Sequence, residues 1–237
     1  MIYIMKKTFF LRLFVFLLLM AILSGFAPEE KKQPVDFVNP YLGNISHLLI
    51  PTFPTVHLPN SFMRLYPRRN DFTDVRMDGL PLIVFDQRRN WAFHLCPYQG
   101  CEEDIQPIIS YSYDNENITP YSWSVFLDEQ QIQVDFGVSH QSAMYQIEFN
   151  NDGDAYLILN SERGMLNWDG ESISGFKSLG NNTKAYIYLL PDQVPQEVYV
   201  LKDHEMLQGR QTRGDNACLV LKYENNPGLV NLTYGIS

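Results

Sequence analysis

Carboxylates are the most numerous side chains in this sequence that could act as acids and bases. Hydrolysis of a glycosidic bond needs two carboxylates at a set separation across the sugar, and one of them must have a raised pKa. Most acidic residues here lie among turn-forming residues, where Asp and Glu serve solvation and turn geometry. They include Glu102-Glu103-Asp104, Asp152, Asp154, Asp169 and Glu171. No pair stands out, so we predict no catalytic residue in this chain.

Histidine and tryptophan supply the remaining candidates for a site. His47 and His57 share one loop, but no His or Cys pair has the spacing of a zinc site. We therefore predict no metal ligand. A tryptophan in a half-buried strand usually belongs to the core. Trp91 is the best exception, since it follows the polar Arg88-Arg89-Asn90 and is a candidate for stacking on a sugar.

The elements that position these residues are predicted to be strands. From about residue 60 onward, hydrophobic and polar residues alternate with period two, and turn residues interrupt the pattern. No window keeps a helical period for three turns, which leaves 191–195 and 202–209 as the only places for a short helix. The fold is then all-β, a large antiparallel β-sandwich. Strands are expected at 81–85, 91–96, 108–113, 121–127, 131–138, 143–149, 155–160, 165–168, 172–177, 184–190, 197–200, 217–223 and 230–236.

The first residues predict export. Basic residues precede the apolar run Leu13–Leu23, and the small residues Ser24-Gly25 follow it, which is the layout of a signal peptide. The alternative is a membrane anchor, which needs about 20 apolar residues. We predict a signal peptide at 1–26, a linker at 27–34 and one β-sandwich domain at 35–237. The expected location is periplasmic, cell-surface or secreted, with no membrane contact after cleavage.

Composition limits the partners. The chain of 237 residues has a formal net charge of −9, and no basic run after the leader is longer than two. A nucleic-acid partner is therefore not expected. Cys96 and Cys101 bracket Pro-Tyr-Gln-Gly, a spacing that fits a disulfide across a turn and equally fits two free thiols. Cys218 lies in an apolar run and is expected in the core.

Two segments near the start resemble the opening of glycoside hydrolase family 92, which consists of exported, largely bacterial α-mannosidases. Residues 35–43 read Val-Asp-Phe-Val-Asn-Pro-Tyr-Leu-Gly, and residues 52–67 read Thr-Phe-Pro-Thr-Val-His-Leu-Pro-Asn-Ser-Phe-Met-Arg-Leu-Tyr-Pro. The family pattern is V-D-x-V-N-P-x-I-G followed by T-[FY]-P-G-A-x-x-P-F-G-M-x-x-L-S-P. Residues 229–237 look like the strand that closes its N-terminal domain. The matching positions are Asn39, Pro40, Gly43, Thr52, Phe53, Pro54, Pro59, Met63 and Pro67.

The resemblance implies an N-terminal β-sandwich packed on a larger helical (α/α)6 barrel. In the family the barrel carries the catalytic carboxylates and most ligands of the required Ca2+. This chain ends at Ser237, at about the join, so we expect the catalytic barrel to be absent from it. The implied partners are a mannose-containing glycan and the helical catalytic domain.

The function expected from the resemblance is that of a non-catalytic domain of a calcium-dependent, exo-acting α-mannosidase, bordering the sugar pocket. The residues expected nearest the sugar are Asn44, His47, Phe53 and His57, with Trp91 as an outside candidate, all positioning the sugar and breaking no bond. The family segments S-G-Y-H-Y and G-F-S-H are missing here, which indicates a divergent subgroup and leaves the linkage preference open. The alternative is a free-standing carbohydrate-binding or cell-surface β-sandwich.

Overall fold

The computed structural model describes residues 32–44, 52–70, 73–85 and 91–237. The chain divides into two units, Met1–Phe37 and Val38–Ser237. In the described part of the first unit, a short 3-10 helix, η1 (Pro34–Phe37), is the regular element. The predicted signal peptide at 1–26 lies outside the described residues, as does most of the predicted linker. No helix in the described ranges has the length and hydrophobicity needed to cross a membrane.

The second unit is built almost entirely from strands, as predicted. A second short 3-10 helix, η2 (Glu102–Asp104), is its only helical segment among the described residues. The strands are β1 (Val56–His57), β2 (Arg64–Leu65), β3 (Arg76–Asp78), β4 (Leu80–Val84), β5 (Trp91–Gln99), β6 (Ser110–Ile118), β7 (Ser122–Leu127), β8 (Ile132–Val138), β9 (Ser142–Phe149), β10 (Ala155–Trp168), β11 (Ile173–Gly180), β12 (Thr183–Pro191), β13 (Glu197–Lys202), β14 (Glu205–Gln208), β15 (Gln211–Tyr223) and β16 (Leu229–Ile236).

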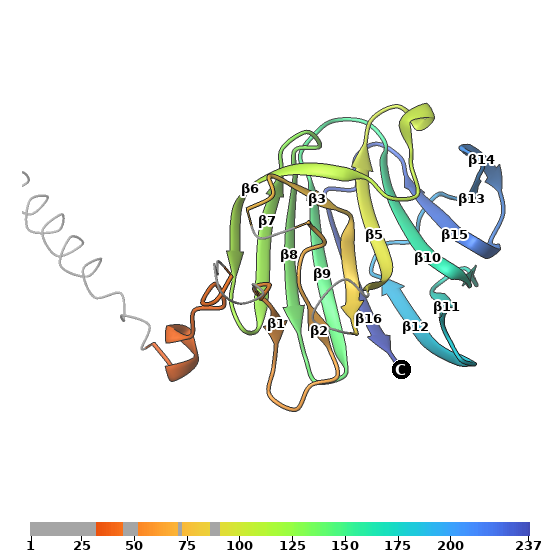
Figure 1. Ribbon diagram of the computed structural model, residues 1–237. Coiled ribbons are helices and arrows are strands. Elements are labelled where there is room, and N and C mark those ends of the chain that lie inside the picture. Colours follow the sequence, from red (N-terminus) through yellow and green to blue (C-terminus); the bar gives the residue numbers. More distant parts are fainter. Residues whose placement is uncertain (1–31, 45–51, 71–72, 86–90) are drawn as a thin grey trace, which may run out of the picture. The chain divides into compact units, whose positions relative to one another are not determined.

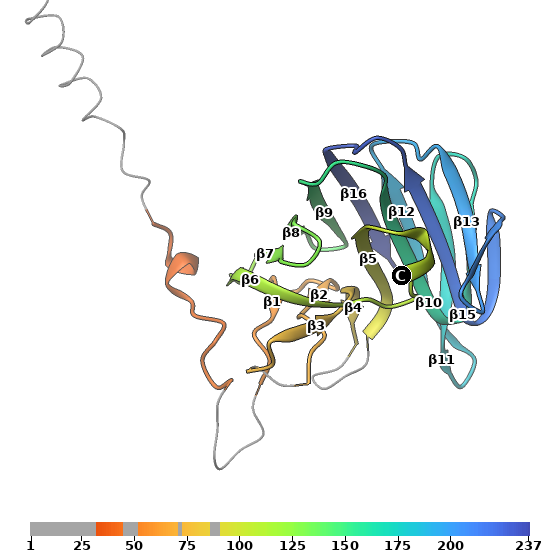
Figure 2. The same cartoon turned by 90° about the horizontal axis from the view of Figure 1, so that it is seen from above.

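Hydrogen bonding links most of these strands into one antiparallel path. The order is β14-β13-β15-β10-β11-β12-β16-β9-β8-β7-β6-β3, and β5 joins it through β10 while also pairing with β4. The path curves back on itself, so that β4 and β5 lie over β9 and β16 as an opposing layer (Figures 1 and 2). The prediction of an all-β antiparallel sandwich is confirmed.

Period-two alternation produces the buried face of these strands. In β7, Trp123, Val125 and Leu127 are buried while the residues between them are partly exposed, and β8 and β9 continue the pattern. Successive side chains of a strand point to opposite faces, so one register of hydrophobic residues fills the core. The buried hydrophobic side chains form one large cluster that runs through nearly every strand.

The prediction of a possible short helix at 202–209 was wrong. Lys202–Glu205 instead closes a hairpin between β13 and β14, with Leu201 paired to Met206. Asp203 and His204 both have positive φ, of 50° and 67°. Two consecutive left-handed residues match the twist of a two-residue hairpin turn. The polar run Lys202-Asp203-His204 therefore turns the chain by 180° and does not begin a helix.

Strand β10 is longer than expected and has a fork along one edge. The sequence predicted separate strands at 155–160 and 165–168, but β10 runs unbroken and pairs with β15 along its whole length. On its other edge, Ala155–Asn160 pairs with β5 and Gly164–Trp168 pairs with β11. A Cβ on Gly164 would lie 2.0 Å from the carbonyl oxygen of Phe176. Glycine therefore lets β11 approach β10 closely at this point.

Tyrosine hydroxyls connect the two layers. Tyr145 of β9 and Tyr234 of β16 each donate a hydrogen bond of 2.7 Å to a carbonyl oxygen of β4, at Pro81 and Leu82 respectively. Both side chains are buried, and burial raises the pKa of each phenol well above its ordinary value. A buried tyrosine needs a partner for its hydroxyl, and these partners hold β4 against the opposite sheet.

The cysteines are all free thiols. Cys96 is buried, Cys101 is exposed and Cys218 is buried. Cys96 faces the core, where its Sγ accepts a hydrogen bond of 3.4 Å from the backbone N–H of Ile109. Desolvation by burial raises the pKa of its thiol to about 11. Of the two alternatives for Cys96 and Cys101, the structure has the unbridged one.

The tyrosine contacts predict a stability effect. Tyr145→Phe and Tyr234→Phe remove one buried donor each and leave a carbonyl oxygen without it, so each should lower the free energy of unfolding by about 1–2 kcal/mol. Urea unfolding at neutral pH measures this. Tyr188→Phe, at an exposed hydroxyl on β12, is the matched control and should change stability by less than about 0.5 kcal/mol. Equal effects at all three positions would contradict a role of these hydroxyls in joining the layers.

Candidate functional site

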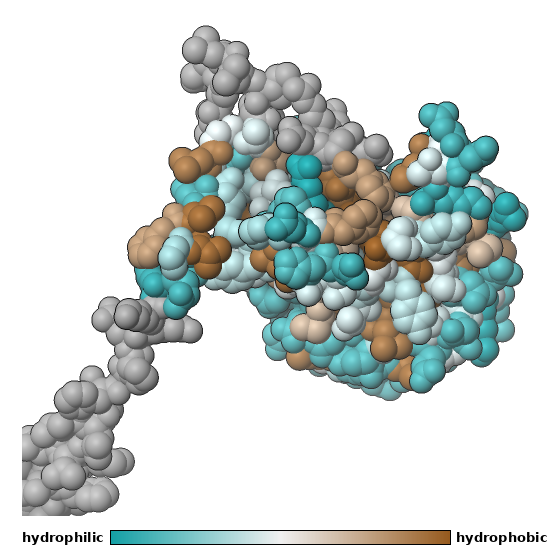
Figure 3. Space-filling model, turned by 90° about the horizontal axis from the view of Figure 1, so that it is seen from below, coloured by the Kyte–Doolittle hydropathy of each residue, from teal (hydrophilic) through white to brown (hydrophobic). Residues whose placement is uncertain are grey.

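A hollow of about 350 Å³ lies where β5 and β11 diverge from the shared edge of β10. We call it the fork hollow. Strand β5 contributes its first residues, β11 its last ones, and the loop after β2 adds an arginine. The lining residues are Arg68, Trp91, His94, Glu162, Arg163, Lys177, Ser178 and Leu179. Figure 3 shows one end of the described part of the molecule, where hydrophobic side chains lie in several areas separated by hydrophilic ones.

Lys177 bridges the two arms of the fork. Its Nζ donates to the backbone carbonyl oxygen of Trp91 at 2.8 Å and to Glu162 Oε2 at 2.9 Å. Only 5% of the Lys177 side chain is exposed, against 38% for Glu162. Lys177 lies opposite Gly164 in the β10–β11 register, and glycine has no side chain to fill the space. The ammonium group therefore ties β11 to the first residue of β5.

Arg68 and His94 form the second polar contact. Arg68 Nη1 lies 3.2 Å from His94 Nε2 and 3.7 Å from Glu162 Oε1. Arginine can only donate, so His94 Nε2 accepts and its proton lies on Nδ1. Burial, and next the charge of Arg68, lower the pKa of His94 to about 3. The imidazole is therefore neutral near pH 7.

Glu162 is the carboxylate of the fork hollow. Desolvation alone would raise its pKa, but the hydrogen bond and charge of Lys177, with smaller effects from His94 and Arg68, lower it below its ordinary value. Glu162 is therefore ionised at neutral pH. It can accept hydrogen bonds from a ligand's hydroxyl groups but cannot supply a proton.

An aromatic stack joins the opening loop to the rim of the hollow. The rings of Phe53 and Tyr66 are parallel with centroids 4.9 Å apart, and Tyr66 meets Trp91 edge-on at 5.7 Å. Arg68 lies over the Trp91 ring at 5.5 Å. Tyr66, Val84 and Trp91 form a small hydrophobic cluster of their own, with Phe53 packed against it. This contact fixes the loop 52–68 beside β5.

The structure brings together two of the five residues expected near a sugar. Phe53 and Trp91 meet through Tyr66. Asn44 is 2% exposed and its side-chain amide has no hydrogen-bond partner, but it does not line the fork hollow. His57 is exposed, and its Nε2 lies 3.1 Å from the carbonyl oxygen of Ser61. His47 lies outside the described residues.

Sequence reasoning missed most of the polar groups of the hollow. Arg68, His94, Glu162 and Lys177 lie on four segments far apart in the sequence, and each looks like an ordinary polar residue in its own segment. Of these four residues, only Arg68 could have been found from the sequence, because it directly follows Pro67, the last residue of the family-like loop.

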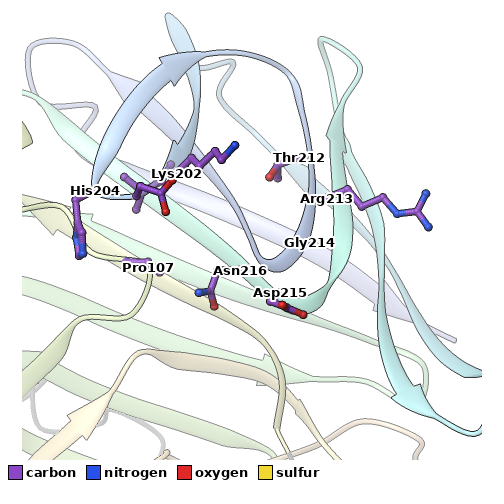
Figure 4. A pocket seen from close by; sticks show the side chains of 10 residues that line it. Pro107, Lys202, His204, Thr212, Arg213, Gly214, Asp215 and Asn216 are labelled. Atoms are coloured by element: carbon purple, nitrogen blue, oxygen red, sulfur yellow. The ribbon is translucent and has the colours of Figure 1, made fainter.

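A second hollow of about 400 Å³ lies beside the β13–β14 hairpin. Figure 4 shows Lys202 and His204 of the hairpin on one side and Asp215 of β15 on the other, with the side chain of Arg213 extending away. Its charged side chains are exposed and balanced, two cations against two carboxylates. It is lined by Pro107, Leu201, Lys202, Asp203, His204, Thr212, Arg213, Gly214, Asp215 and Asn216.

The described part of the chain offers no cluster of the acidic side chains that calcium sites usually include. Among the described residues, no group of three or more His, Cys, Asp or Glu side chains is arranged to hold a metal ion. Glu102, from the acidic run that the sequence contains, is engaged instead by Lys222 and Tyr156, at 2.7 Å and 2.9 Å.

The buried neutral His94 predicts a pH dependence of stability. Its pKa is about 3 in the folded chain and about 6.5 when unfolded. Between these values the unfolded state binds more protons, so the free energy of unfolding falls as the pH falls below about 6.5, by at most about 1.4 kcal/mol per pH unit. His94→Gln should remove this part of the slope in urea titrations from pH 7 to pH 4. His57→Gln, at an exposed histidine, should keep it, and identical slopes for wild type and His94→Gln would rule the account out.

Solved structures share this fold. An inverting mannosidase of family GH92 from Bacteroides thetaiotaomicron matches with a TM-score of 0.73 at 18% identity, over 87% of this chain and 32% of that chain. A GH92 alpha-mannosidase from the same organism matches with a TM-score of 0.75 at 14% identity, over 88% of this chain and 34% of that one. The complex of this alpha-mannosidase with mannoimidazole matches with a TM-score of 0.73 at 15% identity, over 87% of this chain and 32% of that chain.

The chain spans about a third of the length of these solved structures. No curated protein matches the sequence. The sequence does match the glycosyl hydrolase family 92 N-terminal domain over residues 37–237, which includes the whole of the second unit. This chain therefore belongs to the N-terminal domain family of the family 92 glycosyl hydrolases.

Proposed function

We propose that this domain forms one wall of the sugar pocket of an exported, exo-acting α-mannosidase whose catalytic carboxylates lie outside the described residues. The family match and the mannosidase neighbours support the reaction class. The mannoimidazole complex of one neighbour supports a mannose-like ligand. The composition of residues 1–26, a basic start followed by an apolar run, supports export.

The fork hollow is the observation that carries the proposal. Sugar sites combine an aromatic surface with a few fixed polar groups that set orientation. Here the Phe53–Tyr66–Trp91 stack, in which Tyr66 and Trp91 are buried, supports a guanidinium at Arg68 and a carboxylate at Glu162. The hollow has the residue types of a sugar-contacting surface, and the family-like loop 52–67 leads directly into it.

Glu162 would orient a sugar and would not cleave it. An inverting glycosidase needs a protonated carboxylic acid and a second carboxylate about 6.5–9.5 Å away. The acid must have a raised pKa, whereas that of Glu162 is lowered. Glu162 is also the only carboxylate among the described residues that line the hollow. Proton transfer to the leaving oxygen is therefore assigned to groups beyond this domain.

Calcium dependence is also part of the proposal, and it concerns the remainder of the enzyme. The described residues supply no cluster of ligands for the ion, so we assign no step of binding or catalysis in this domain to calcium.

A second candidate function is a free-standing carbohydrate-binding domain. Tyr186 and Tyr188 on the outward face of β12 are 51% and 56% exposed. Tyr186 lies beside Phe176 of β11, with centroids 6.2 Å apart. Exposed aromatic rows of this kind are rare on monomers without a binding role, and a flat row on a sheet can stack on sugar rings.

Variants in the fork hollow and on the exposed face of β12 distinguish the two candidate functions. In titrations of the purified chain with methyl α-mannoside followed by NMR, Arg68→Gln should weaken binding about tenfold, because it removes a charged hydrogen-bond donor. Tyr188→Ala should leave binding unchanged. The opposite pattern would favour the aromatic row and the free-standing domain.

The same preparation tests the assignment of catalysis. The purified chain should release no mannose from α-mannobiosides in the presence of calcium, because the fork hollow lacks a protonated acid. Measurable turnover, abolished by Glu162→Gln, would mean that Glu162 has a catalytic role after all.

A further inference from the structure

The fork hollow carries an excess of positive charge in an acidic protein. Among the described residues, its charged lining consists of Arg68, Arg163 and Lys177 against the carboxylate of Glu162, while His94 is neutral. The chain as a whole has a formal net charge of −9. The neighbouring hollow beside β13–β14 balances its charges, with two of each sign. The excess is therefore a local property of the fork.

Arg163 joins the hollow through an unusual backbone conformation. Alternate residues of a regular strand point to opposite faces, so Arg163 and Glu162 would be expected on different sides of β10. Both nevertheless line the hollow. Arg163 has a φ of +55°, a left-handed conformation that is uncommon outside glycine and breaks the alternation of the strand. The backbone at the fork thus places Arg163 among the lining residues of the hollow, with an exposed side chain.

Two further groups of the hollow are donors without acceptors. Trp91 Nε1 and His94 Nδ1 are buried and have no hydrogen-bond partner. Because His94 Nε2 accepts from Arg68, its Nδ1 carries the hydrogen. Buried polar groups nearly always have a hydrogen-bond partner, and a buried donor left without one costs about 1–3 kcal/mol. Both orphan groups are therefore N–H donors; their nitrogen atoms are shielded from solvent, so they add positive partial charge beside the hollow and do not contact a ligand in it directly.

We propose that the fork hollow binds an anionic substituent, a phosphate or a carboxylate, carried by the glycan that the domain contacts. This inference rests on the proposed function and names the chemistry of its ligand. Guanidinium groups bind phosphate and carboxylate oxygens through short, charge-assisted hydrogen bonds. Lys177 is already committed to Glu162 and Trp91, so it supplies charge, and Arg68 and Arg163 supply the donors. The Arg68 side chain is 27% exposed, and its partial burial strengthens its electrostatic interactions relative to bulk water.

The test follows the indole N–H resonance of Trp91 in the purified full chain, at constant ionic strength. The probes are inorganic phosphate, methyl α-glucuronide and neutral methyl α-mannoside. We expect phosphate or the glucuronide to shift the Trp91 signal in a saturable way and to leave the core Trp123 signal unmoved. Tighter binding of phosphate would identify a phosphate group as the ligand, and tighter binding of the glucuronide would identify a carboxylate.

Arginine variants decide whether the site is specific. Arg163→Gln, at an exposed side chain that makes no core contact, should weaken anion binding about three- to tenfold, as loss of one charge-assisted contact does. Arg213→Gln, in the neighbouring hollow, is the matched control and should leave binding unchanged. Equal binding by wild type and Arg163→Gln would mean an adventitious ion only and would overturn the proposal.

The neutral probe separates this proposal from the proposed function. Mannoside binding that responds to Arg68→Gln, without any competition by phosphate or glucuronide, would overturn the anion site and leave the sugar wall in place. Anion binding that responds to Arg163→Gln, without mannoside binding, would support the anion site and count against the sugar wall. If neither ligand moves the Trp91 signal, both proposals fail.

Discussion

One edge of a β-strand can hydrogen bond to only one neighbour at each position, and β10 divides its edge between two. Strand β5 takes the first half and β11 takes the second. Where they part, β5 no longer pairs with β10, although Trp91 still pairs with Val84 of β4. Beyond this point the Lys177 ammonium donates a hydrogen bond to the carbonyl oxygen of Trp91. The cation in turn needs an anion, because a buried unpaired charge is strongly destabilising. Glu162 supplies it, and the polar surroundings of the hollow follow from that pairing.

Close backbone approach keeps the fork narrow. Gly164 of β10 lies against the backbone of β11, and Gly175 of β11 lies against the backbone of β10. A Cβ on either glycine would lie within about 2.2 Å of a carbonyl oxygen of the other strand. On the other arm, Tyr66 packs between Phe53 and Trp91, and the Tyr145 and Tyr234 hydroxyls hold β4 from the opposite sheet. Both arms are thus anchored in the core, so the polar groups between them have fixed positions. Fixed donors bind a ligand with less loss of entropy than mobile ones.

The fold was largely predictable because its signal is local. Period-two alternation in segments such as 122–127 and 142–149 places every second side chain in the core, and this pattern needs no knowledge of the neighbours. The secondary-structure predictions were wrong where the local residue pattern and the observed strand pairing differ. Gly164 looks like a break between two strands, yet it is the residue that admits β11. The polar residues at 202–204 look like a helix start, yet their left-handed φ values form a turn.

The sequence by itself determined the fold class, the family and the loop that leads to the site, because alternation, turn residues and the ordered prolines of residues 52–67 can be recognised along the chain. Only the tertiary structure decided which side chains share the fork hollow. Arg68, His94, Glu162 and Lys177 come from separate strands and loops, and their meeting depends on how β5 and β11 divide one edge of β10. Strand pairing between distant segments is a long-range property. No single segment encodes it, so neither the charge of the hollow nor its unpaired donors could be read from the residues in order.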